Sequence, residues 1–271
     1  MKTFLTGSKG FLGSDIQNSI AECIDLAYSR NTKILYPQIE QISLDQNFQI
    51  IHCGASSSRH SIGNQIYLNN YYATKQLVDA VAKDKSNRLI FMSANSILER
   101  NNISMCKDLY SHLKLESEHY IKEKLSVSQY AIIRLPGLYK RGHLGAGLID
   151  KIMGATFNGE LRHFELYAKK KFNNMALTKD IVNFVKIIIQ KKELPGAIGS
   201  IGTIDSISLS ELRNRLIDLQ PSLSRFITLN QTDMIEQEVN NTQKAFQLGY
   251  SSYGIIELIE FLYGKHTNSR T

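Results

Sequence analysis

The chain has 271 residues, which is enough for one large domain or for one domain with a smaller lobe. Apolar residues make up 42% of it and charged residues 21%, as in ordinary globular proteins, and no apolar run approaches the ~18 residues that a membrane span needs. The net charge of +7 is scattered, without zinc-finger spacing or an aromatic-rich RNA-binding motif, so we expect an acidic small-molecule substrate, no nucleic acid and no membrane.

Short apolar runs alternate with longer amphipathic stretches through the first half of the chain, the pattern of a parallel sheet with helices on both faces. The predicted strands are Lys2–Thr6, Cys23–Tyr28, Gln49–Cys53, Arg88–Ser93 and Tyr130–Leu135. The predicted helices are Phe11–Ile20, Ile66–Lys83 and Lys107–Lys124. The segment 32–47 is too short for a full strand–helix unit, so we expect a reduced sheet there.

After Pro136 the pattern loosens into a glycine-punctuated stretch. Regularity returns with a helix at Lys179–Lys191, a strand near Ala197–Thr203, and helices at Ser208–Leu219 and Tyr253–Leu262. The predicted fold is therefore α/β, a Rossmann-like doubly wound parallel sheet with a smaller C-terminal substrate lobe. We expect the nucleotide-binding domain over 1–136 and about 172–203, and the substrate lobe over 137–171 and 204–271.

Three glycines, Gly7, Gly10 and Gly13, come directly after the first predicted strand. Glycines there allow a tight turn and let backbone approach a pyrophosphate, whereas three glycines alone also serve ordinary turns. The predicted cofactor contacts in this loop are Gly7, Ser8, Lys9, Gly10, Phe11, Leu12 and Gly13.

The second predicted strand ends in "AYSRNT", which places Arg30 where a ribose-binding residue is expected. No carboxylate stands beside it. An arginine suits the 2′-phosphate of NADP, whereas a carboxylate would bind the ribose hydroxyls of NAD. We therefore expect NADP, with NAD as the alternative; a solvated arginine at a strand end is the other interpretation of Arg30.

A tyrosine and a lysine four residues apart, Tyr110 and Lys114, share one face of a predicted helix. An ammonium beside a phenol stabilises the phenolate and lowers the phenol's pKa toward neutral pH, which suits general acid/base chemistry. The chain has three other such pairs: Tyr71/Lys75, Tyr120/Lys124 and Tyr167/Lys171. Only Tyr110/Lys114 begins the helix that follows the strand "RLIFMSANS", where it can face the carboxyl ends of the strands.

Taken in order along the chain, these features resemble the extended short-chain dehydrogenase/reductase family of nucleotide-sugar epimerases, dehydratases and reductases. The matching segments are "TGSKGFLG", "IIHCGASSS", "NNYYATKQLVDAV", "RLIFMSANS", Tyr110-Ser-His-Leu-Lys114, "IIRLPGLYKRG", "NNMALTKDIV" and "NNTQKAFQLGY". The glycine spacing of the first segment is this family's own form of the loop.

The resemblance implies roles for these positions. Tyr110 would be the general acid/base, and Lys114 its electrostatic partner that also holds the nicotinamide ribose. Further cofactor contacts would come from Gly54, Ala55, Asn70 and Pro136. The helices at Ile66–Lys83 and Lys107–Lys124 would form a four-helix bundle with a second subunit, making a homodimer.

The family's catalytic strand hydroxyl falls on Ala94 in an ungapped match. Ser96 points the same way as residue 94 if the strand stays extended, and Ser93 replaces it if the strand bulges. Alternatively, both serines only cap the strand end. Asn95 and Ser96 stand where the dehydratases have an acidic pair, which disfavours elimination.

The sequence therefore predicts NADP-dependent reduction of a keto-deoxysugar nucleotide. An epimerase of the same family and a non-catalytic NAD(P)-binding sensor or scaffold are the alternatives. The predicted substrate contacts are Tyr139, Arg141, His143 and Arg162, although each of the charged ones suits an exposed surface position equally well. Three widely spaced cysteines and an N-terminal apolar stretch too short for a signal peptide indicate a cytoplasmic protein without a metal site.

Overall fold

The computed structural model describes residues 1–29, 35–42, 47–56, 64–100, 103–106, 108–143, 147–157, 162–232 and 242–264. Arg30 lies outside the described residues. The chain divides into two compact units. Unit 1 comprises Met1–Leu135, Ile181–Ser200 and Gln243–Tyr250, and unit 2 comprises Pro136–Asp180, Ile201–Thr242 and Ser251–Thr271. The domain limits predicted from sequence differ from this division at residue 136 and over 172–180, 201–203 and 243–250, and the predicted limits stay a prediction.

Unit 1 is built on a six-stranded sheet in which all strand pairs are parallel. Across the sheet the order is β12 (Gly196–Ser200), β7 (Tyr130–Leu135), β4 (Arg88–Ala94), β3 (Phe48–His52), β1 (Lys2–Thr6) and β2 (Cys23–Asp25). The central strands β3 and β4 are buried along their whole length, as expected for a sheet covered on both faces. The predicted Rossmann-like α/β class is confirmed.

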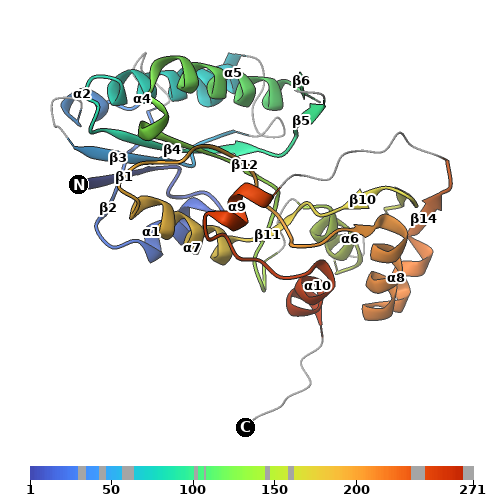
Figure 1. Ribbon diagram of the computed structural model, residues 1–271. Coiled ribbons are helices and arrows are strands. Elements are labelled where there is room, and N and C mark those ends of the chain that lie inside the picture. Colours follow the sequence, from blue (N-terminus) through green and yellow to red (C-terminus); the bar gives the residue numbers. More distant parts are fainter. Residues whose placement is uncertain are drawn as a thin grey trace, which may run out of the picture. The chain divides into compact units, whose positions relative to one another are not determined.

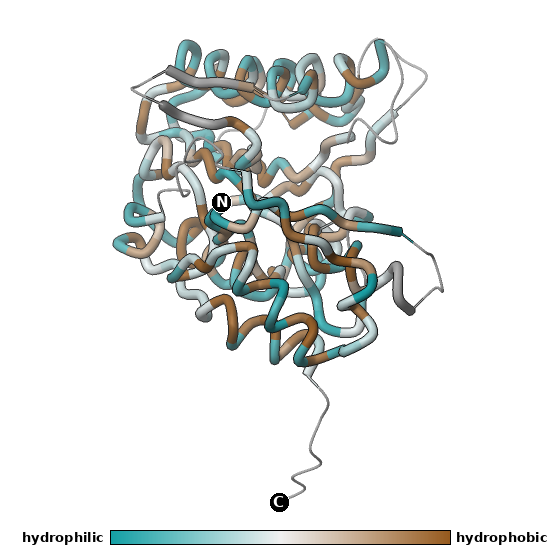
Figure 2. Tube along the Cα trace, turned by 90° about the vertical axis from the view of Figure 1, so that its right-hand side faces the viewer, coloured by the Kyte–Doolittle hydropathy of each residue, from teal (hydrophilic) through white to brown (hydrophobic). Residues whose placement is uncertain are grey.

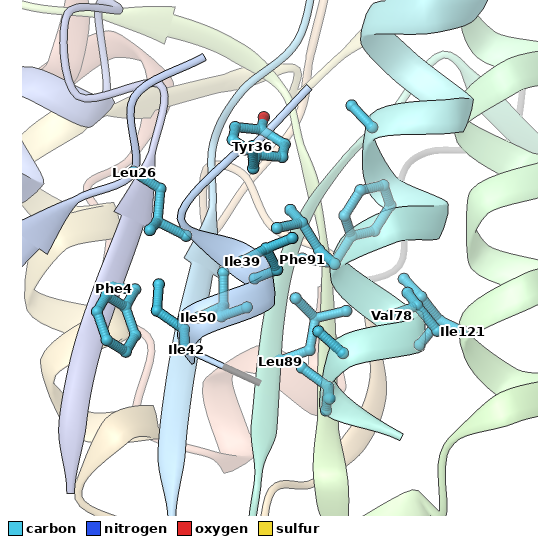
Figure 3. Packing of buried hydrophobic residues seen from close by; sticks show 14 of the residues in the cluster. Phe4, Leu26, Tyr36, Ile39, Ile42, Ile50, Val78, Leu89, Phe91 and Ile121 are labelled. Atoms are coloured by element: carbon cyan, nitrogen blue, oxygen red, sulfur yellow. The ribbon is translucent and has the colours of Figure 1, made fainter. Parts of the chain in front are cut away.

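Helices cover both faces of this sheet (Figure 1). On one face lie α2 (Ile39–Ile42), α4 (Ala73–Val81) and α5 (Leu109–Lys124), and on the other α1 (Gly13–Ser19) and α7 (Thr178–Ile189). Figure 3 shows apolar side chains of the strands and of α4 and α5 packed into one cluster, including Phe4, Ile50, Leu89, Val78 and Ile121. Burying each such side chain contributes about 1.5–3 kcal/mol.

The strand order places a topological switch point between β1 and β3. From β1 the chain moves outward to β2, returns to β3 on the other side of β1, and then continues through β4, β7 and β12. In open parallel sheets, ligands bind outside the carboxyl ends of the strands at such a point. The turn after β1 and the segment after β3 therefore define where a nucleotide is expected.

Several element limits differ from those predicted. The first helix begins at Gly13 instead of Phe11. The helix expected over Ile66–Lys83 is interrupted, since α3 (Asn64–Tyr67) passes into a π-helical turn, η1 (Leu68–Tyr72), before α4. In this turn Asn70 Nδ2 donates to the Ile66 carbonyl and Thr74 Oγ1 donates to the Asn70 carbonyl. Side chains thus occupy carbonyls that an α-helix would give to backbone amides.

The turn after β4 leads into an antiparallel hairpin of β5 (Ile97–Arg100) and β6 (Ile103–Cys106), which was not predicted. After α5 comes a short 3-10 helix, η2 (Val127–Gln129). Helix α9 (Gln243–Gln247) also belongs to unit 1, and Lys244 at its N-terminal end donates to the carbonyls of Pro195 and Ala197 beside β12. The late helix expected before the Leu-Gly-Tyr turn is therefore present.

Unit 2 has its own apolar core, formed by α6 (Leu148–Phe157), α8 (Leu209–Leu219) and α10 (Ile255–Tyr263) together with short strands. The strands pair as β8 (Gly137–Tyr139) with β11 (Met175–Leu177), β9 (Phe164–Tyr167) with β14 (Ile227–Asn230), and β10 (Lys171–Phe172) with β13 (Ile207–Ser208). The 3-10 helix η3 (Pro221–Arg225) follows α8. Helix α6 was not predicted, because glycines precede it and suggested a loop.

Hydrophobic and hydrophilic residues alternate along the helices, as Figure 2 shows. In the part of the chain that the structure describes, no helix has the length and apolar character needed to cross a membrane.

Candidate cofactor and active site

The turn after β1 is built from glycines that have no space for a side chain. Gly7 has φ of +73°, a conformation that residues with a Cβ rarely adopt. A Cβ on Gly7 would lie 2.7 Å from the Gly54 nitrogen, and one on Gly13 would lie 2.0 Å from the Gly7 carbonyl oxygen. The Gly10 N–H donates to the Gly7 carbonyl at 2.9 Å and closes the turn. Bare backbone therefore stands at the carboxyl end of β1, which suits the close approach of a pyrophosphate.

The other residues of this turn differ in exposure. Lys9 and Phe11 are exposed, and Ser8 is partly exposed, so their side chains are accessible to a ligand. Leu12 is buried in the core, so its side chain packs inside unit 1 and only its backbone is available. The predicted cofactor contact at Leu12 is thus restricted to main-chain atoms.

The segment after β3 is held against this turn at both of its ends. At the first end, the Gly54 N–H donates to Thr6 Oγ1 at 3.1 Å. At the other, the Ser56 N–H donates to Asn70 Oδ1 at 3.0 Å, and Asn70 Nδ2 donates to the Ser56 carbonyl at 2.8 Å. Between them, Ala55 is exposed. The buried Asn70 side chain thus shapes the segment that the resemblance assigns to cofactor binding.

Lys114 points from α5 toward the carboxyl ends of β3 and β4. Its side chain is buried, and Nζ donates to the Met92 carbonyl at 2.8 Å and lies 4.5 Å from the centre of the Phe91 ring. Burial lowers the pKa of this amine to about 8, against the opposing effects of Cys53 and Glu118. Since Cys53 directly precedes Gly54, the amine lies beside the strand end that flanks the glycine turn.

Tyr110 lies one helical turn before Lys114, in the first turn of α5. Asp108 caps that turn by accepting from the Ser111 N–H at 2.8 Å. Burial, followed by the Asp108 carboxylate, raises the pKa of the Tyr110 phenol to about 12. This shift of the Tyr110 pKa is opposite in direction to the one we expected from Lys114, because burial and the Asp108 carboxylate both disfavour the phenolate. The phenol is therefore protonated at neutral pH.

Ser93 is committed to a buried ionic network. Its hydroxyl donates to Glu118 Oε1 at 2.6 Å, and the same carboxylate receives Arg134 Nε at 2.9 Å and Arg134 Nη2 at 2.8 Å. The strand does not bulge at this point, because Ser93 and Ala94 pair in register with Arg134 and Leu135 of β7. Ser93 is thus held toward α5, and no motif or spacing marks Glu118 as its partner.

Ser96 lies beyond the end of β4, in the turn before β5, so the extended alternation expected from Ala94 to Ser96 is absent. The Ser96 and Ser111 hydroxyl oxygens are 2.6 Å apart, and Ser111 also donates to Asp108 Oδ1 at 2.7 Å. A hydroxyl has one proton and a carboxylate only accepts, so Ser111 gives its proton to Asp108 and receives that of Ser96. Ser96 therefore offers lone pairs to a ligand, beside the turn that carries Tyr110.

The predicted substrate residues lie in unit 2. Tyr139 is fully buried in its core, within hydrogen-bond distance of the Ile149 N–H, and therefore packs instead of facing solvent. Arg141, His143 and Arg162 are exposed, and the Arg141 guanidinium lies 5.1 Å from the centre of the Phe261 ring. The predicted cofactor residue Pro136 is the first residue of unit 2 and is buried.

No family model matches the sequence, and no curated protein matches it. Solved structures match over nearly the whole chain. UDP-glucose 4-epimerase from Thermotoga maritima, with UDP-glucose, has a TM-score of 0.73 at 17% identity and covers 97% of each chain. The dTDP-4-dehydrorhamnose reductase from Bacillus anthracis, with NADP, has a TM-score of 0.69 at 16% identity over 96% of this chain and 98% of that one.

A third match, UDP-N-acetylglucosamine 4-epimerase from Bacillus cereus, has a TM-score of 0.68 at 20% identity over 97% of this chain and 98% of that one. The chain therefore has the fold of nucleotide-sugar reductases and epimerases. The resemblance inferred from the motifs is confirmed at the level of the fold.

Proposed function

We propose that this protein is an NAD(P)-dependent oxidoreductase of the extended short-chain dehydrogenase/reductase type that reduces a keto group of a nucleotide-linked sugar. The observation that carries the proposal is the meeting of two features at the switch point of the sheet. The side-chain-free turn at Gly7 packs against Gly54, and the buried Lys114 amine lies beside Cys53, the residue before Gly54. The proposed dinucleotide site and α5, the helix that carries Tyr110 and Lys114, therefore lie at the same carboxyl end of the sheet.

The glycine turn and the segment 54–56 would hold the cofactor, which supplies the hydride when bound. The absence of side chains at Gly7 and Gly13 fits a pyrophosphate against the backbone. NADP is the preferred cofactor in this proposal because of Arg30. Titration with NADPH and NADH, followed by nicotinamide fluorescence, tests the choice: equal affinities, or tighter binding of NADH, would overturn the preference for NADP.

Tyr110 would donate the proton that the reduced carbonyl oxygen requires. The phenol is protonated at neutral pH, as it would be with its ordinary pKa near 10, and this is the form that a general acid must have at the start of a reduction. An epimerase needs the opposite starting state, because its first step removes a proton from a sugar hydroxyl. A phenol with an ordinary pKa near 10 is protonated at neutral pH as well, so turnover on a panel of keto-sugar nucleotides, and not the shift in the Tyr110 pKa, separates the reductase from the epimerase.

Ser93 and Ser96 support the proposed reduction less than Tyr110 does. Ser93 donates to Glu118, and the Ser96 proton goes to Ser111, so neither hydroxyl is set to donate to a carbonyl oxygen. In this proposal Tyr110 alone supplies the proton, and Ser96 has no direct role in the proton transfer. We expect Ser96→Ala to reduce turnover by less than the ~10²-fold that follows loss of a preorganised donor.

The decisive experiment is NADPH oxidation with a panel of 4-keto-6-deoxy sugar nucleotides. We expect turnover by the unaltered chain and its loss in Tyr110→Phe. Tyr71→Phe is the matched control, because Tyr71 also has a lysine four residues on but lies on η1. No turnover with any member of the panel, or equal rates in Tyr110→Phe and the unaltered chain, would refute the proposal.

A non-catalytic dinucleotide-binding protein is the second candidate, and Ala94 favours it. This residue closes β4 at the place where the family's hydroxyl is expected, and the serines on either side have other partners. Binding of NADPH together with inactivity across the whole panel would establish this candidate in place of the reductase.

We also propose that two copies associate in a four-helix bundle through the helical segment of α3, η1 and α4 and through α5. Tyr67, Leu68 and Leu109 are large apolar side chains exposed on these elements, and the Tyr67 and Tyr71 rings are 5.5 Å apart. Sedimentation velocity tests the association. We expect a dimer that dissociates in a Tyr67→Lys/Leu68→Lys variant, and a monomeric unaltered chain would refute it.

A further inference from the structure

His52, the last residue of β3, is a fully buried histidine for which the proposed reaction has no use. Both of its ring nitrogens are in contact with threonine hydroxyls. Nδ1 lies 2.6 Å from Thr6 Oγ1 at the end of β1, and Nε2 lies 3.0 Å from Thr74 Oγ1 on α4. The ring thus joins the end of the glycine-loop strand to a helix on one face of the sheet.

The neighbouring hydrogen bonds determine which nitrogen carries the proton. Thr74 Oγ1 donates its single proton to the Asn70 carbonyl at 2.8 Å, so toward His52 it can only accept. His52 Nε2 must therefore carry a hydrogen. Burial, together with the nearby Lys114 ammonium, lowers the pKa of His52 well below its usual value, so the ring is neutral and Nδ1 is an acceptor.

The chain of donors then runs in one direction. The Gly54 N–H donates to Thr6 Oγ1, Thr6 donates to His52 Nδ1, His52 Nε2–H donates to Thr74, and Thr74 donates to the Asn70 carbonyl. Ser117 Oγ of α5 also lies 3.1 Å from this carbonyl, but the nearer acceptor for its single proton is the Leu113 carbonyl at 2.8 Å. A chain whose members all point the same way strengthens each of its bonds.

The two ends of this chain meet on one short segment. Gly54 is the first donor, and Asn70, whose carbonyl is the last acceptor, binds both the N–H and the carbonyl of Ser56 through its side chain. The segment 54–56 is therefore closed into a loop of hydrogen bonds with His52 at its centre. Gly54 is also the residue against which Gly7 packs without room for a Cβ.

We propose that His52, as the neutral Nε2–H tautomer, is a positioning residue that holds the segment 54–56 against the glycine turn in the shape that binds the dinucleotide. This inference rests on the proposed function and adds a residue to its cofactor site. His52 touches no cofactor. It acts through Thr6 and Asn70, and its loss lowers the fraction of molecules whose segment 54–56 is ready to bind.

Thr74 provides the cleanest test because it can be changed while His52 is kept. Thr74→Val preserves the shape but removes the acceptor for Nε2–H, whereas Thr74→Ser retains the hydroxyl. An unsatisfied buried group of this kind lowers the population of the closed segment enough to weaken NADPH binding by about tenfold. We expect that loss in Thr74→Val and recovery in Thr74→Ser, with the rate at saturating cofactor unchanged.

The dissociation constant separates positioning from simple stabilisation, since it is measured far below the unfolding temperature. Equal affinity for NADPH in Thr74→Val and the unaltered chain would overturn the inference, even if Thr74→Val unfolded at a lower temperature. If the unaltered chain bound neither dinucleotide, the proposed function would fail, and the positioning role with it.

Nitrogen-15 NMR of histidine-labelled protein decides the tautomer without any cofactor, with His52→Gln used to assign the signal. We expect a protonated Nε2 and an unprotonated Nδ1 at neutral pH, and loss of this pattern in Thr74→Val. A doubly protonated ring, or a proton on Nδ1, would contradict the hydrogen-bond chain itself, whatever the chain's activity proved to be.

Discussion

Removing Arg134 should destabilise unit 1 strongly, because it leaves a buried carboxylate without its main counter-charge. Glu118 is 1% exposed and receives two hydrogen bonds from Arg134, which is itself only 7% exposed. After Arg134→Met, the described partners left to Glu118 are the Ser93 hydroxyl and Lys122, whose Nζ is 3.8 Å away on the exposed side of α5. Breaking a buried ion pair on one side costs about 3–5 kcal/mol.

That loss corresponds to a fall in Tm of about 10 °C, since each kcal/mol shifts the midpoint by about 2–4 °C for a unit of this size. Scanning calorimetry of Arg134→Met measures it, with the double variant Arg134→Met/Glu118→Leu as the control. The double variant should recover much of the loss, because no charge then remains buried. A Tm change under about 2 °C in Arg134→Met, or a double variant less stable than the single one, would show that the charge was not the cause.

Three further outcomes follow from the site. The Lys114 amine has a lower pKa in the folded chain, so the unfolded chain binds more protons between about pH 8 and 10.5, and stability rises with pH in this window. Urea titrations should show the unaltered chain gaining up to about 3 kcal/mol across the window relative to Lys114→Met. A difference between the two chains that stays constant with pH would be evidence against the lowered pKa. Gly13→Ala should lower Tm and abolish NADPH binding, because its Cβ would meet the Gly7 carbonyl oxygen at 2.0 Å. Gly142→Ala, whose Cβ meets no described atom within 4 Å, should cost only the ~1 kcal/mol of its positive φ, and equal Tm and equal NADPH affinity in the two variants would contradict this. For Tyr110→Phe, NADPH affinity should be kept while turnover falls by about 10²-fold or more, and unchanged turnover would remove the phenol from the reaction.

The class of fold was predictable from the sequence because it depends on patterns that are local along the chain. Runs such as Lys2–Thr6 and Tyr130–Leu135 have an apolar centre and the length of one strand, and the structure has strands at those residues. The glycines at 7, 10 and 13 were predictable as a tight turn for a similar reason: the restriction on φ and on space belongs to the residue type. The fold of the whole chain then followed from the order of these local features.

What the sequence did not reveal are the contacts between residues far apart in it. Ser93 and Glu118 are 25 residues apart, and Thr6 and His52 are 46 apart, so no spacing rule connects them. The π-turn around Asn70 likewise depends on Ser56 and Ser117, which lie outside the helix that contains it. Helix periodicity alone indicates a regular helix there.

Sequence by itself determined which residues are chemically able to act, namely a glycine turn, a phenol and an amine one helical turn apart. Only the tertiary structure decided their state. It buries Lys114 against the Met92 carbonyl, raises the pKa of Tyr110, turns Ser93 toward Glu118 and encloses Tyr139 in the core of unit 2. The physical reason is that pKa values, hydrogen-bond direction and exposure depend on which distant groups the fold brings close, and residue type and spacing do not contain that information.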